Sequence, residues 1–147
     1  MRHHIPGLNS GNSDLVNNLE GLFLVRVERA SYRWQSPKPF LSLRFRILEP
    51  PSFEALSFTG RVYCTERALW KLTWFLHDFG YDTELLTRDQ IDEKAFLNLQ
   101  GIVRTTFTRL NGHCYQNLEA FAPASEWDAL SYASNDHADQ QSTHDDL

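Results

Sequence analysis

Basic and aromatic side chains occur together in the segment 30–39 and on the strand-like segments that follow it. Bases outside a duplex expose flat faces on which aromatic rings stack, and their phosphates attract cations. Arginine serves both purposes, because its planar cation can also stack. The combination predicts binding to single-stranded nucleic acid, with aromatic residues on the bases and basic residues on the phosphates. The predicted binding residues are Arg33, Trp34, Lys38, Arg44, Arg46, Arg61, Tyr63, Arg104 and Tyr115.

Motifs that would predict catalysis are missing from the sequence. There is no GxSxG turn, no glycine-rich phosphate loop, no HExxH motif and no group of carboxylates with a histidine. A zinc site built from Cys64, Cys114, His77 and His113 would lack the paired ligand spacing that such sites use. We therefore expect a non-enzymatic protein without metal or cofactor. An accessory role to a nuclease or another enzyme is a weaker alternative.

The formal charge of −5 at first argues against a nucleic-acid partner. The charge is unevenly distributed, however. Residues 21–63 contain seven basic and three acidic residues, whereas residues 64–99 contain four basic and seven acidic ones. Residues 122–147 contain six acidic residues and no Lys or Arg. Positive charge is therefore concentrated on the predicted strands, and removal of the acidic tail is expected to strengthen binding, most visibly at low salt.

Five segments have the composition and alternation of strands, and they are interrupted by helical patterns. Asn111-Gly112 predicts a tight hairpin turn between the last two strands. An apolar stripe predicts a helix from Thr65 to Phe79 that ends at Gly80, and a second, shorter helix is predicted over Arg88–Leu99. The predicted strands are residues 21–29, 40–48, 60–64, 101–110 and 113–121.

The order of these elements predicts a mainly β domain with the architecture of the OB-fold. That fold is a five-stranded Greek-key barrel, here with a helix between the third and fourth strands, and it binds oligonucleotides on its second and third strands and adjoining loops. The alternative is an open antiparallel α+β sheet with the helix packed on one face. We expect a flexible N-terminal arm at 1–20, the OB-fold domain at 21–122 and a disordered acidic tail at 123–147.

A second set of residues predicts contacts with a partner protein. Trp70 and Trp74 share a helix face opposite the apolar stripe; this face either packs under the 88–99 helix or the N-terminal arm, or contacts a partner. In the tail, Trp127 and Leu130 have the spacing to dock as a short helix. The alternative function is therefore an OB-type module that recruits a replication or recombination protein. The sequence leaves homo-oligomerisation open.

Localisation is expected to be cytoplasmic, without a membrane partner. No apolar run approaches the length of a membrane span, and the first residues, Met1–Pro6, lack the apolar stretch of a secretory signal. Two cysteines that lie 50 residues apart do not suggest a disulfide scaffold.

The body resembles an uncharacterised phage-associated family of small proteins suspected to be single-strand-binding OB domains. The resemblance rests on the segments 21–25, 41–47, 60–63, 68–76, 79–80, 99–104 and 111–117, and covers about residues 20–122. The chain departs from the family at Pro37-Lys38-Pro39 and in the longer loop 50–58. The resemblance implies a role in phage or mobile-element DNA replication or recombination. The leading hypothesis is sequence-nonspecific binding of single-stranded DNA, with RNA left open as a partner.

Overall fold

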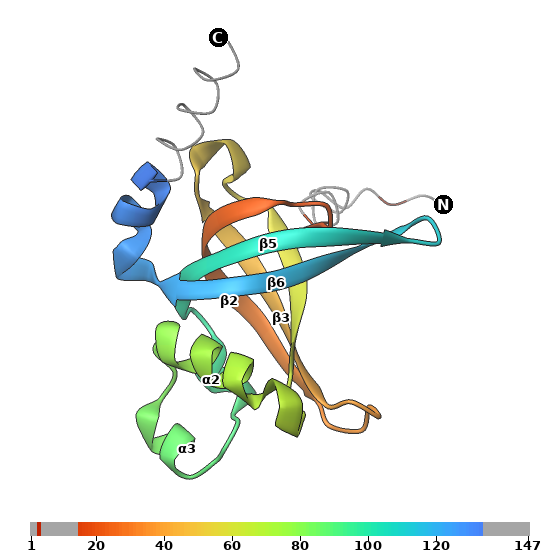
Figure 1. Cartoon of the computed structure of the whole chain (residues 1–147), viewed down its shortest axis with the longest axis vertical. Coiled ribbons are helices and arrows are strands. Elements are labelled where there is room, and N and C mark those ends of the chain that lie inside the picture. The colour runs from red at the N-terminus through yellow and green to blue at the C-terminus, as the bar shows by residue number, and fades with distance from the viewer. Residues whose placement is uncertain (1–2, 4–14, 134–147) are drawn as a thin grey trace, which may run out of the picture.

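A single mixed β-sheet organises the chain, whose computed structural model describes residues 3 and 15–133 (Figure 1). The spatial order of the strands is β1-β4-β3-β2-β5-β6, and this sheet is not closed into a barrel. β1 pairs parallel with β4, and the other neighbours pair antiparallel. The domain is therefore mainly β, as predicted. The strands are β1 (Leu15–Val16), β2 (Gly21–Arg33), β3 (Phe40–Glu49), β4 (Ser57–Tyr63), β5 (Gln100–Leu110) and β6 (His113–Pro123).

Helix α2 (Leu69–Asp78) lies across one end of the sheet and covers the core there (Figure 1). Most of the predicted apolar stripe is its buried side, with Leu72, Phe75 and Leu76, whereas Leu69 at its start is exposed. The ring of Phe75 packs 6.3 Å from Phe45 of β3 and 5.2 Å from Phe121 of β6, measured between ring centroids. The helix ends as predicted, because Gly80 adopts a φ of +71°. The shorter helices are η1 (Pro51–Phe53), η2 (Glu66–Ala68), α3 (Thr83–Thr87), η3 (Glu93–Phe96) and η4 (Ala124–Glu126).

A bulge in β2 decides which of its side chains face outward. Val25 and Val27 are buried, as the alternation from Phe23 predicts, and Val27 pairs with Phe45 of β3. The next pair in register is Arg29 with Arg44, so Glu28 is the extra residue. Beyond the bulge the even-numbered residues, beginning with Ala30, face the core. Arg29 consequently lies on the outer face, on the same side as Arg44.

The Leu118 side chain of β6 packs against β4 although no hydrogen-bonded ladder joins these two strands. A Cβ atom on Gly60 of β4 would lie 2.6 Å from the side chain of Leu118 of β6, so glycine is required for this close approach. Near β1, Asn17 donates to the carbonyl of Cys114 over 3.3 Å, and Gln116 accepts from the amide of Leu19 over 3.0 Å. Residues next to β1 therefore connect β4 and β6 at one end.

Several predicted boundaries are wrong, each for a local reason. The third predicted strand begins at Ser57 rather than residue 60, and it gains a parallel neighbour, β1. The helix predicted over Arg88–Leu99 is absent from the described residues. Helical structure starts earlier instead, because the Asp82 carboxylate accepts from the amides of Glu84 and Leu85 and begins α3. Asp89 then adopts a φ of +55°, and η3 alone follows.

The segment predicted as the acidic tail begins with helical residues. η4 continues into helical residues 127–133, and we call residues 124–133 the C-terminal helical segment. Its Leu130 lines a hollow with Leu22 of β2 and Ile102 of β5, and Ile102 is only 1% exposed. Most of the predicted arm and residues 134–147 lie outside the described residues. Among the helices of the described part, none is long and apolar enough to cross a membrane.

Candidate nucleic-acid interface

Six arginines share the outer face of three adjacent strands, which we call the arginine face. Antiparallel register places Arg26 opposite Arg46 and Arg29 opposite Arg44. Their apolar neighbours in sequence point the other way, into the core. Within residues 26–33, 40–46 and 57–63, the one acidic residue is Glu28. The arginine face consists of Arg26, Arg29, Arg33, Arg44, Arg46 and Arg61.

Aromatic rings lie at the end of this face that is nearest the β2–β3 loop. Phe40 pairs in register with Arg33 on one side and Tyr63 on the other. The guanidinium carbon of Arg61 sits 4.3 Å from the centroid of the Phe40 ring, a cation–π contact. In the loop itself Lys38 is exposed, and the Trp34 side chain is 64% exposed. The predicted loop and strand residues are thus brought together.

Glu28 organises the centre of the arginine face. Its carboxylate accepts from Arg46 and, over 3.0 Å, from the Ser57 hydroxyl, and it lies 3.2 Å from Nε of Arg44. Partial burial of Glu28 opposes its ionisation. The hydrogen bonds from Arg46 and Ser57 and the charges of Arg46 and Arg44 outweigh that effect, so the pKa of Glu28 lies below its ordinary value. Glu28 therefore partly neutralises two of the predicted phosphate contacts.

Two guanidinium groups on the arginine face have a buried nitrogen that donates no hydrogen bond. Nε of Arg26 and Nε of Arg44 have no hydrogen-bond partner among the described residues. Glu28 lies 3.2 Å from Nε of Arg44, as an ion pair without a hydrogen bond at that atom. A buried donor without a partner costs free energy.

Replacing Glu28 with Gln is expected to lower the melting temperature at neutral pH by roughly 3–8 °C, for a loss of about 1–2 kcal/mol. Because the folded-state pKa of Glu28 is lowered from 4.5, its stabilising effect is complete above that value. The effect is lost as the pH falls through the folded-state pKa. The two melting temperatures should therefore converge at acidic pH, and circular dichroism melts measure this. Glu54→Gln, an exposed residue, is the control; a pH-independent difference for E28Q would contradict the assignment.

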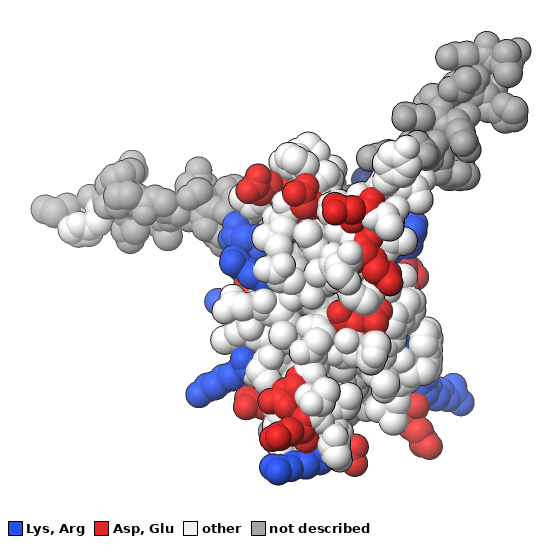
Figure 2. All heavy atoms as spheres, turned by 90° about the vertical axis from the view of Figure 1, so that its left-hand side faces the viewer, with Lys and Arg blue, Asp and Glu red and all other residues white. Residues whose placement is uncertain are grey.

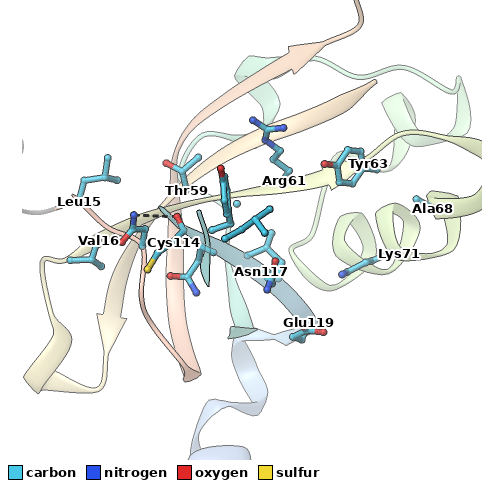
Figure 3. Close-up of a pocket in the computed structure, with 16 residues that line it drawn as sticks. Leu15, Val16, Thr59, Arg61, Tyr63, Ala68, Lys71, Cys114, Asn117 and Glu119 are labelled. Atoms are coloured by element: carbon cyan, nitrogen blue, oxygen red, sulfur yellow. Dashed lines mark hydrogen bonds between the residues drawn. The ribbon is translucent and has the colours of Figure 1, made fainter. Parts of the chain in front are cut away.

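Between β4 and β6 runs a groove of about 820 Å³, which we call the seam groove (Figure 3). Arg61 and Tyr63 line it from β4, Lys71 from α2, and Asn117 and Glu119 from β6. The predicted stacking residue Tyr115, also on β6, lines the same groove and is half exposed. The groove therefore joins the arginine face, through Arg61, to aromatic and polar side chains of a distant part of the sequence.

Arg104 is the predicted residue that the structure separates from the others. It lies on β5, in register with Leu22 and Ala120, and lines the hollow next to Glu126 of the C-terminal helical segment. The residues of the arginine face or seam groove that were missed from the sequence include Arg26, Arg29, Phe40, Lys71, Asn117 and Glu119. For Arg29 a signal existed, namely the change of apolar positions from odd to even after Val27.

The side of the molecule that carries α3 and the C-terminal helical segment has a different character. Figure 2 shows that acidic side chains run down this face and that Lys and Arg lie at its margins. In the described part of the chain, no group of three or more His, Cys, Asp or Glu side chains is placed to hold a metal ion. The acidic side is thus unsuited to phosphates.

The predicted partner-binding tryptophans of α2 divide into a packed and an exposed residue. Trp74 packs edge-on against Phe121 at 5.6 Å and donates to the Asp78 carboxylate over 2.8 Å. Trp70 stacks on Trp74 with 6.3 Å between ring centroids, and its side chain is 66% exposed. The face therefore packs on β6 rather than under the predicted 88–99 helix, and Trp70 stays accessible.

The strands and α2 carry most of the segments on which the resemblance to the phage-associated family rests. The relationship to that family stays an expectation from the sequence. Comparison with protein-family models and with curated proteins finds no match to this chain.

Proposed function

We propose that this protein binds single-stranded DNA with little sequence preference and without catalysis. The observation that carries the proposal is the arginine face: six cations on three adjacent strands, with Glu28 as the one acidic residue within residues 26–33, 40–46 and 57–63. Cations spaced along strands suit the repeated phosphates of a nucleic-acid backbone.

Exposed aromatic rings support a single strand over a duplex as the ligand. Trp34, Tyr63 and Tyr115 each present a ring at the edge of the arginine face or in the seam groove. Stacking on a base contributes about 1–3 kcal/mol and requires a base that is not already paired and stacked in a duplex. A duplex would reach the arginines but leave these rings unused.

An OB-type barrel is the proposed relationship behind this arrangement. The strands β4-β3-β2-β5-β6 and the helix between β4 and β5 follow the order expected for that fold. OB barrels are partly open, and here the Leu118 side chain lies against Gly60 where the closing ladder would be. β1 is an addition at the edge. The proposed setting is cytoplasmic DNA replication or recombination of a phage or mobile element.

Titration of the full-length protein with dT oligomers tests the proposal. Trp34 lies in the proposed path, so its fluorescence should be quenched on binding. The affinity should fall steeply as salt rises, because each phosphate contact releases counterions. A duplex of equal length should compete poorly. Absence of both quenching and salt-sensitive affinity at low salt would overturn the proposal.

A second candidate function is recruitment of a replication or recombination protein. It is favoured by Trp70 and Leu69, which are both exposed at the start of α2. Trp127 and Leu130 are half-buried in the C-terminal helical segment, which leaves them less available than the tail prediction supposes. Trp70→Ala would reduce recovery of such a partner in a pull-down if this candidate is right, and unchanged recovery would count against it.

A further inference from the structure

A chain of hydrogen bonds fixes the polar side chains on the β6 side of the seam groove. The hydroxyl of Thr106 donates to the Glu119 carboxylate over 2.6 Å. The Asn117 amide nitrogen donates to Thr106 over 3.3 Å and to the hydroxyl oxygen of Thr108 over 2.9 Å. Because a carboxylate can only accept, the single proton of the Thr106 hydroxyl goes to Glu119. Thr106 must therefore accept from Asn117, and this fixes the orientation of the amide.

This network leaves acceptors, and no amide donors, at Asn117 and Glu119. Both amide protons of Asn117 are used by the two threonines, so its Oδ1 atom is left to accept from a ligand. One oxygen of Glu119 is occupied by Thr106, and the other is left. The neighbouring Gln116 is already engaged, because its amide donates to the carbonyls of Leu19 and Thr106 and accepts from the Leu19 amide.

Cations and aromatic rings surround this pair of acceptors. Arg61 and Lys71 line the same groove and can hold phosphates on either side of a base. Tyr63 and Tyr115 supply rings for stacking. The groove is large enough for a base, with a volume of about 820 Å³. A base that enters it would present its Watson–Crick edge to acceptors.

We propose that the seam groove is a subsite for guanine within the single-stranded DNA path. This inference rests on the proposed function and adds a base preference at one position. Guanine carries two adjacent donors on its Watson–Crick edge, N1–H and the N2 amino group, which match the two acceptors at Asn117 and Glu119. On the same edge, adenine and cytosine each carry one amino donor next to a ring nitrogen that accepts. Thymine carries one N–H donor between two carbonyl acceptors. Each of those bases would therefore place one of its own acceptors against the oxygen of Asn117 or Glu119.

Inosine provides the sharpest probe, because it differs from guanine only by loss of the N2 amino group. Fluorescence anisotropy would compare dT 12-mers that carry one central dG, one central dI or no replacement. We expect the dG oligomer to bind the full-length protein about 3- to 10-fold tighter than the dI oligomer, which is less than a bidentate pair at a duplex base can give. Glu119→Gln should bring the dG-to-dI affinity ratio close to one.

Variants separate a specific subsite from a general effect of charge. Glu84→Gln, on exposed α3, also removes one carboxylate and should keep the dG preference. Asn117→Ser, which loses the fixed amide oxygen that would accept from N1–H, should weaken binding of the dG and dI oligomers alike and leave their ratio less changed than E119Q does. Equal affinity of the wild type for dG and dI, with dT binding intact, would overturn the subsite and leave the proposed function standing. Failure to bind any of the three oligomers would overturn both.

Discussion

Substitution of both Arg29 and Arg61 by Gln is expected to weaken binding of a dT oligomer about 10- to 100-fold at low salt. These two arginines lie on the arginine face but are not paired with Glu28, whose partners are Arg44 and Arg46. Their charge is therefore available to phosphates, and their removal leaves the central ion pairs in place. The loss should be smaller at high salt, where the phosphate contacts of the wild type are themselves weaker.

The salt dependence of this variant tests the mechanism independently of the affinity. Loss of two phosphate contacts should reduce the slope of log affinity against log salt by about 1.4, since each contact on a single strand contributes about 0.7. Arg61→Gln alone should reduce it by about half as much. Arg88→Gln, at the end of α3 and outside the three strands, removes the same charge and is the matched control. An equal loss of affinity in R88Q would point to net charge rather than to the arginine face.

Alternation and turn residues are sufficient to predict most of the strands of this fold. Leu41, Leu43, Phe45 and Ile47 are all buried, because a strand with one covered face must alternate. Asn111 and Gly112 both adopt positive φ between β5 and β6, as a tight hairpin requires. The parallel pairing of β1 with β4 could not be predicted, because a two-residue strand has no periodicity and depends on tertiary contacts alone.

The candidate site was predicted less completely, and the errors have physical causes. Arg44 and Arg46 were predicted to contact phosphates, but their ion pairs with Glu28 depend on a bulge that places Glu28 on the same face. The same bulge turns Arg29 outward. The seam groove joins β4 to β6 across about 50 residues of sequence, and only the packing of Gly60 against Leu118 brings those edges together. Contacts between residues so far apart in the chain produce no local sequence pattern from which the groove could be predicted.

The acidic C-terminus is the remaining feature that we expect to act on the arginine face. Residues 134–147 contain Asp136, Asp139, Asp145 and Asp146 and no Lys or Arg. They follow Ala133, which lines the hollow with Leu22 on β2. Arg26 lies four residues further along the same strand, about 13 Å away at 3.3 Å per residue. A chain of this length can span up to about 46 Å, so these aspartates can reach the arginines.

Truncation after Ala133 is therefore expected to raise the affinity for dT oligomers about 3- to 10-fold at low salt, with the gain vanishing toward about 1 M salt as screening increases. Truncation after Ala122 would be a poorer test, because it removes Leu130 and uncovers the buried Ile102. Replacing the four aspartates by Asn in the full-length chain is the control for length, and it should reproduce the gain. If competition by charge is the mechanism, both variants must lose their advantage together as salt rises; a gain that persists at high salt, or that only the truncation shows, would rule it out.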